Sequence, residues 1–134
     1  MTQEDKELLL KDLSARLSYG VKIETPKGIG ELGTIKLTIF YHELGVNIKA
    51  TERDYFPLDE CKPYLRPLSS MTEEEVTQIE MLGWRRDEYT KEIWGSVDLS
   101  QTLSLIDWLN AHHLDYRRLI ERGLAIGAPE GMYN

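Results

Sequence analysis

The stretch TIKLTIFYHELGVNIKA at residues 34–50 decides the fold class, because apolar and polar side chains alternate along both of its halves. A period of two sends successive side chains to opposite faces of a β-sheet. Residues 34–41 therefore predict one strand, and residues 46–50 predict another. The short segment between them, residues 42–45, contains a glycine and is typical of a hairpin loop.

Further strands are expected on both sides of this hairpin. A third strand opens at Val21, and the glycine-rich KGIGELG at residues 27–33 is interpreted as its flexible connection to the hairpin. A fourth short strand is expected at Phe56, before Pro63 interrupts regular pairing. Residues 19–67 thus predict a small, curved antiparallel sheet, with an SH3-like partial barrel as the alternative arrangement.

The N-terminal residues 1–18 predict a helix that packs on this sheet. Thr2 is a suitable N-cap, and Gly20 can supply the left-handed residue that ends the helix. Apolar residues recur between them at spacings of three and four and form one stripe: Leu9, Leu10, Leu13 and Leu17.

Residues 68–134 are predicted to be mainly helical. Thr72 and Glu75 have the spacing of a capping box, so a helix is expected to begin at Glu73 and to stop at Gly83. The pattern from residue 84 to residue 97 shows neither clear periodicity nor a strong boundary.

Two more helices are expected beyond that segment. One opens at Asp98 or Ser100 and runs towards His113, and a short last helix is capped by Asp115 and ended by Gly123. The tail LAIGAPEGMYN that follows is apolar enough to dock back on the rest of the chain. We therefore expect residues 1–134 to form a single α+β domain, which is the usual size for one hydrophobic core.

The charge balance narrows the choice of partners. The chain has 16 Lys and Arg against 23 Asp and Glu, a net charge of −7. This sign is wrong for a general binder of nucleic acid or of anionic membranes. Residues 1–67 carry 10 basic and 11 acidic side chains, whereas residues 68–134 carry 6 and 12. The acidic character belongs to the second half.

The sequence also indicates a compartment. Cys61 is the single cysteine, so an intramolecular disulfide is excluded and the thiol is expected to act as a small apolar side chain. The N-terminal residues carry acids where a secretory signal has a basic flank, and no stretch approaches the roughly 18 apolar residues that span a bilayer. A cytoplasmic protein with no membrane partner is predicted.

The densest group of reactive side chains lies near residues 107–118. Imidazoles and carboxylates together suggest a metal site or acid–base catalysis. However, His112 and His113 are adjacent, so on a helix their side chains would point about 100° apart, unlike histidines four residues apart on one face. We therefore predict no catalytic residue, no metal and no cofactor. The same region is predicted to contact a partner through Trp108, His112, His113, Asp115, Tyr116, Arg117 and Arg118.

A second group of interest consists of basic residues in the β region. With an aromatic side chain, either Phe40 or Tyr55, they could form a small face that binds single-stranded nucleic acid. The alternation assigns several of them to solvent, so a solvated sheet face is the preferred interpretation. The residues are Lys22, Lys27, Lys36, Lys49 and Arg53.

Two longer segments resemble a known family. They are FPLDECKPYLRPLSSMTEEE at residues 56–75 and IDWLNAHHLDYRRLIERGLAIGAPEGMYN at residues 106–134. They are similar to short uncharacterised proteins from gut Bacteroides-type bacteria and their prophages or other mobile elements. The family pattern has Gly after Asp-Tyr-Arg, where this chain has Arg118. The resemblance implies an accessory protein of a phage or mobile element and carries no activity.

Taken together, these patterns favour a non-enzymatic protein-interaction or accessory module whose partner is another protein. Two alternatives stay open: a nucleic-acid-associated factor that uses the basic sheet face, and a metal-dependent enzyme at His112, His113 and Asp115. The sequence leaves the identity of the partner and the oligomeric state open.

Overall fold

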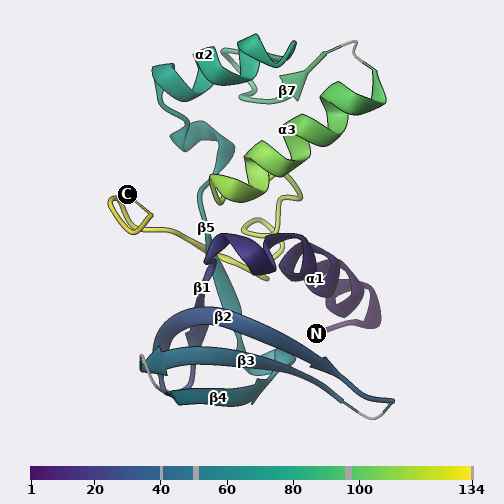
Figure 1. Ribbon diagram of the computed structural model, residues 1–134, viewed down its shortest axis with the longest axis vertical. Coiled ribbons are helices and arrows are strands. Elements are labelled where there is room, and N and C mark those ends of the chain that lie inside the picture. The colour runs from purple at the N-terminus through teal and green to yellow at the C-terminus, as the bar shows by residue number, and fades with distance from the viewer. Residues whose placement is uncertain (40, 50–51, 96–97, 134) are drawn as a thin grey trace.

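The computed structural model describes residues 1–39, 41–49, 52–95 and 98–133, and Figure 1 shows how its elements are arranged. The helices are α1 (Gln3–Arg16), α2 (Glu73–Met81) and α3 (Leu99–Ala111). The strands are β1 (Lys22–Thr25), β2 (Gly28–Leu37), β3 (His42–Lys49), β4 (Glu52–Pro57), β5 (Lys62–Leu65), β6 (Arg85–Arg86), β7 (Ile93–Trp94) and β8 (Ile126–Gly127). The fold class is α+β, as the sequence predicts.

Six of the strands form one sheet in the order β4-β3-β2-β1-β5-β8. Strands β1 to β5 pair antiparallel with their neighbours, and β8 joins β5 in parallel, so the sheet is mixed. The sheet ends at β4 on one side and at β8 on the other and does not close into a barrel. In Figure 1, α1 lies between this sheet and the α2–α3 region.

The long hairpin of β2 and β3 has a different register from the predicted one. Strand β2 ends at Leu37 and β3 begins at His42, and between them the backbone N–H of Thr38 donates to the carbonyl of Tyr41 at 2.9 Å. Residues 42–45 belong to β3, so the predicted loop position is wrong. Ile39, between the two strands, is 91% exposed although it belongs to the alternating pattern. Phe40 and Ala50 lie outside the described residues.

The glycine-rich segment 27–33 is another correction, because it is almost entirely strand. Its glycines allow close approach of the backbone to a neighbouring strand. A Cβ at Gly30 would lie 2.7 Å from the carbonyl oxygen of Asn47 in β3. The connection to β1 is instead a tight turn between Thr25 and Gly28, which are paired residues.

Helix α1 has the predicted start, but it ends at Arg16, and Leu17, which was predicted to belong to the apolar stripe, is 36% exposed. Thr2 accepts a hydrogen bond from the backbone N–H of Asp5 at 3.0 Å, and Gly20 has a φ of 71°. Leu9 and Leu13 are fully buried. They belong to the larger hydrophobic cluster, whose buried members are Leu9, Leu13, Val21, Ile23, Leu32, Leu44, Val46, Phe56, Leu58, Cys61, Leu65, Leu119, Leu124 and Ala125.

Strand β5 is unexpected from the sequence, because Pro63 lies inside it. Residues 62 and 63 pair with β1, and residues 64 and 65 pair with β8. Pro63 is therefore paired on one side only, opposite Ile23, which is the situation in which a strand tolerates the missing N–H of proline.

The α2–α3 region contains the predicted capping box and a second one. Thr72 accepts from the backbone N–H of Glu75 at 3.1 Å, and Asp98 is paired in the same way with Gln101. Between the two helices, β6 and β7 form a short antiparallel hairpin. These elements enclose the smaller hydrophobic cluster, whose buried members are Met71, Ile79, Leu105, Leu109 and Leu114.

The predicted last helix is absent, because residues 115–123 form a series of turns. The carboxylate of Asp115 accepts from the backbone N–H groups of Leu119 and Ile120 at 2.8 and 3.0 Å. Arg118 has a φ of 58°, and this left-handed residue interrupts any right-handed helix.

The tail docks back, as expected from its apolar composition. The backbone N–H of Ala128 donates to Leu65 of β5 at 2.7 Å, and the hydroxyl of Tyr133 donates to the carbonyl of Tyr64 at 2.6 Å. Across the described ranges, none of the helices combines the length and the apolar character needed to cross a membrane.

Candidate functional site

Residues 56–75 and residues 106–134 lie side by side in the structure. The backbone N–H of Arg66 donates to His113 at 2.7 Å, and the N–H of Asp115 donates to Arg66 at 2.8 Å. Residues far apart in the sequence are thereby brought to one place, next to the tail. The predicted partner-binding residues surround this crossing point.

The adjacent imidazoles turn to different neighbours. The ring of His112 stacks on Trp108 with centroids 3.9 Å apart, and its Nδ1 lies 2.8 Å from the carbonyl oxygen of Trp108. The ring of His113 stacks on Tyr133 with centroids 3.7 Å apart. Two rings held in this way offer no shared position for a metal ion. The described part of the chain contains no group of three His, Cys, Asp or Glu side chains arranged to hold one.

His113 is nearly buried, with 8% of its surface exposed. Burial, together with the positive charges of Arg16 and Arg66, lowers the pKa of His113 to about 4. Its imidazole is therefore neutral at neutral pH. The Nδ1 atom is buried and makes no hydrogen bond with the described residues.

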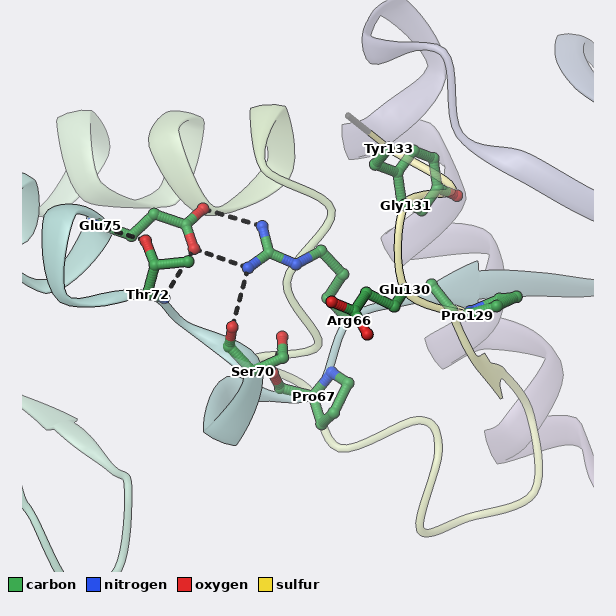
Figure 2. Close-up of a pocket in the computed structure, with 10 residues that line it drawn as sticks. Arg66, Pro67, Ser70, Thr72, Glu75, Pro129, Glu130, Gly131 and Tyr133 are labelled. Atoms are coloured by element: carbon green, nitrogen blue, oxygen red, sulfur yellow. Dashed lines mark hydrogen bonds and ion pairs between the residues drawn. The ribbon is translucent and has the colours of Figure 1, made fainter.

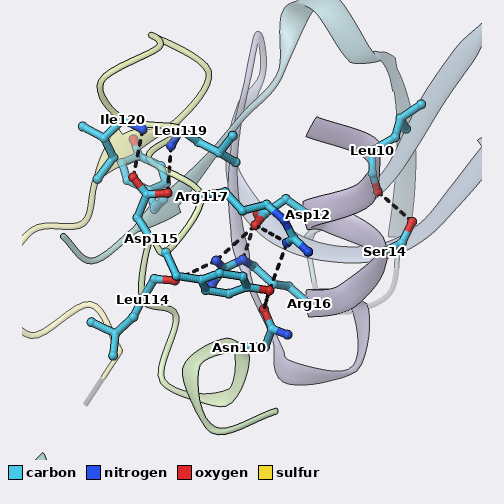
Figure 3. Close-up of polar contacts among 12 residues, drawn as sticks. Leu10, Asp12, Ser14, Arg16, Asn110, Leu114, Asp115, Arg117, Leu119 and Ile120 are labelled. Carbon is cyan, nitrogen blue, oxygen red and sulfur yellow. Dashed lines mark hydrogen bonds and ion pairs between the residues drawn. The ribbon is translucent and has the colours of Figure 1, made fainter. Parts of the chain in front are cut away.

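A buried ion cluster lies beside the histidines, between α1 and the turns after α3 (Figure 3). The Asp12 carboxylate accepts from Arg16 at 2.8 Å and from Arg117 at 3.0 Å. Arg16 also donates to the carbonyl of Leu114 at 2.7 Å, and both Asp12 and Arg16 are 0% exposed. Such a pair stabilises a fold only while each charge keeps its partners.

Tyr116 completes this cluster. The guanidinium groups of Arg16 and Arg117 lie 5.2 and 4.8 Å from the centroid of its ring. Its hydroxyl donates to Asn110 at 3.0 Å and accepts from Arg117 at 2.9 Å. The sequence singled out Tyr116 and Arg117, but it contained no signal that Asp12 and Arg16 would join them.

The remaining predicted residues are also engaged within the chain. The indole N–H of Trp108 donates to Gln78 at 3.1 Å, and Asp115 holds the turn that follows it. Arg118 is exposed and forms an ion pair with Glu92 at 2.6 Å. The seven residues are thus neighbours, but they do not converge on one open site.

An ion pair that the sequence did not indicate stands nearby. Arg66 donates to both carboxylate oxygens of Glu75, at 2.8 and 2.6 Å. The guanidinium of Arg66 is the main reason that the pKa of Glu75 is lowered to about 2. This pair joins the residue that follows β5 to the first turn of α2. The capping box identified Glu75, but nothing local identified Arg66 as its partner.

An open hollow of about 500 Å³, which we call the tail pocket, lies beside Arg66. Figure 2 shows the Arg66–Glu75 pair on one side of it and the tail on the other. All of its lining residues come from segments 56–75 and 106–134: Arg66, Pro67, Ser70, Thr72, Glu75, Ala128, Pro129, Glu130, Gly131 and Tyr133.

The basic residues of the sheet have different partners. The Lys36 ammonium lies 5.8 Å from the centroid of the Tyr55 ring, and Arg53 donates to the side chain of Asn47 at 3.0 Å. Lys27 is instead paired with Asp54 at 3.9 Å. Lys36 and Arg53 thus contact neutral side chains, whereas Lys27 contacts an acidic one.

Cys61 belongs to the larger hydrophobic cluster and is 1% exposed. Burial raises the pKa of its thiol to about 12, so the reactive thiolate is disfavoured. The side chain packs as a small apolar group.

Comparisons with known proteins give no match: no family model, no curated protein and no solved structure is similar to this chain.

Proposed function

We propose that this chain is a non-enzymatic protein-interaction module that receives a segment of a partner protein in the tail pocket. The resemblance of residues 56–75 and 106–134 supports a role as a cytoplasmic accessory protein of a phage or mobile element. The observation that carries the proposal is the contrast between the pocket and its surroundings. The pocket is open, whereas the nearby Asp12, Arg16 and Asp115 side chains are held by hydrogen bonds within the chain.

The walls of the tail pocket suit a peptide. Pro67 and Pro129 present apolar surface on opposite sides, while Ser70 and Thr72 add hydroxyl groups. A mixture of apolar walls and a few placed polar groups is typical of ligand sites. The volume is large enough for one or two side chains of a partner.

The proposal can be tested before the partner is identified. Random peptides displayed on phage are selected on the full chain, and the enriched peptides are then titrated against variants. Ala128→Trp should fill the pocket and weaken binding at least tenfold. Leu37→Trp, on the exposed end of β2, is the matched control and should bind like the wild type.

Folding of Ala128→Trp is checked by circular dichroism. As a second measurement, the same peptides should shift the amide resonances of Gly131 and Tyr133 in the wild-type chain. Failure to enrich any peptide would overturn the proposal. So would peptides that bind Ala128→Trp unchanged and leave those resonances in place.

A further inference from the structure

We infer that the tail pocket takes a basic side chain, a lysine or an arginine of the partner segment, against the Glu130 carboxylate. This inference rests on the proposed function and names the chemistry of the occupant. Four observations support it: the neutralisation of Arg66, the position of Glu130, the apolar surface around it and the charge of the surrounding region.

Arg66 cannot serve as a receptor for an anion, because its guanidinium is already used. Both terminal nitrogens donate to the Glu75 carboxylate, and they also donate to the carbonyl oxygens of His112 and Ser70 at 3.3 and 3.2 Å. A bidentate pair of this kind is strong and directional. Glu75 and Arg66 therefore cancel each other within the pocket wall.

Glu130 carries the remaining charge of the lining. It is exposed, and among the described residues it forms no ion pair. Figure 2 shows its side chain reaching from the tail towards Arg66 and Pro67. Lys22, a basic residue near the tail, lines a separate hollow together with Met132. The lining of the tail pocket thus has one uncompensated negative charge.

The groups around Glu130 suit the long stem of a basic side chain. Pro67 and Pro129 offer aliphatic surface, and lysine and arginine bury their methylene groups on such surface while the charged end stays hydrated. Tyr133, whose ring stacks on His113, also lines the pocket, and an aromatic ring attracts a cation placed over its face. The neutral imidazole behind that ring adds no repulsion.

The net negative charge of the surrounding region also favours a positively charged ligand. Residues 68–134 have 12 acidic and 6 basic side chains, and the three arginines 117, 118 and 122 are paired with Asp12, Glu92 and Asp5. An acidic surface attracts a basic segment over a distance of about 10 Å at moderate salt.

The test uses three small probes and the full 15N-labelled chain. The probes are the Nα-acetyl amides of arginine, lysine and norleucine, and norleucine has the apolar stem without the charge. We expect the arginine and lysine amides to shift the resonances of Gly131 and Tyr133, and the norleucine amide to bind at least fivefold more weakly.

A matched pair of variants identifies the carboxylate. Glu130→Gln should weaken binding of the arginine amide at least fivefold, whereas Glu80→Gln, an exposed glutamate on α2, should leave it unchanged. Equal binding of norleucine, or unchanged binding by Glu130→Gln, would overturn the inference. If displayed peptides still bind the pocket without a basic residue, the proposed function stands and only this inference fails.

Discussion

The two hydrophobic clusters of the molecule differ in size. Among the described residues, the larger one, between α1 and the sheet, has 14 buried members, and the smaller one has five. The smaller one, under α2, α3 and the β6–β7 hairpin, is bordered by half-buried Trp84 and Trp108. Large apolar side chains stay exposed in the same region, including Leu99 at 73% and Trp94 at 60%.

The difference indicates that the stability of the α2–α3 region depends on its contacts with α1. A small cluster supplies little free energy of folding, because stabilisation grows with the apolar area that is buried. The attachment is polar: Arg16 of α1 donates to the carbonyl of Leu114, whose side chain belongs to the smaller cluster. Asp12 holds Arg16 and Arg117 on the other side.

The largest expected effect comes from breaking this attachment. Asp12→Asn leaves the buried Arg16 guanidinium without a counter-charge, and loss of one partner of a buried pair costs about 3–5 kcal/mol. Urea unfolding measures the loss. Asp59→Asn is the control, because its pair with Lys6 is exposed and should contribute at most about 0.5 kcal/mol. Equal losses in the two variants would show that the ion cluster does not join the regions.

Substitutions that create a cavity in one cluster or the other should show further how the two clusters differ in stability. Leu44→Ala in β3 should cost about 3 kcal/mol, and Leu105→Ala in α3 about 2 kcal/mol, because Leu44 is fully buried whereas Leu105 is 5% exposed and lies in the smaller cluster. Hydrogen exchange is the sharper measurement. Leu105→Ala should speed exchange of the α2 and α3 amides and leave the β2–β3 amides unchanged. If both sets accelerate together, the two clusters open as one unit.

The free energy of unfolding should depend on pH because of His113, which stacks on Tyr133 of the tail. The pKa of His113 is about 4 in the folded chain and about 6.5 when unfolded, so the unfolded state takes up the proton first. Stability is therefore lost as the pH falls from 6.5 towards 4, and about 2 kcal/mol is gone at pH 5 relative to pH 8.

The change is measured as urea unfolding at pH 8 and pH 5 for the wild type and His113→Asn. Asparagine tolerates the φ of 60° at this position and does not titrate, so most of the difference should vanish. Glu75 affects stability at lower pH, between about pH 4.5 and pH 2, where protonation of its carboxylate removes the pairing with Arg66. A variant that keeps the full loss at pH 5 would contradict the assignment to His113.

The smallest effect concerns the turns that connect the clusters. Arg118→Gly should stabilise the chain by about 0.5–1 kcal/mol, because glycine adopts a φ of 58° without strain and the exposed pair with Glu92 contributes little. The matched control is Gly123→Ala at a φ of 73°, which should cost about 1 kcal/mol. Destabilisation by Arg118→Gly would mean that the ion pair outweighs the backbone strain.

Elements held by interactions between residues close in the sequence were predictable, and elements that depend on distant residues were not. The starts of α1 and α2 were predictable, since Thr2 and Thr72 satisfy backbone N–H groups three residues away. The turn of the long hairpin was not, because the alternation continues through residues 38–41. Strand β5 was missed as well, since Pro63 argues against a strand unless the one-sided pairing is known.

For the candidate site, the sequence alone determined which chemical groups are concentrated near residues 107–118. The divergence of the imidazoles was predicted from helical spacing, but His112 and His113 follow the end of α3, and their ring directions are set by stacking on Trp108 and Tyr133. Only the tertiary structure decided their partners: Asp12 with Arg117, Arg66 with Glu75, and the tail against Pro67. The physical reason is that local signals act through hydrogen bonds within one turn of the backbone. Pairs between distant segments depend instead on how the whole chain packs, and no local pattern encodes them.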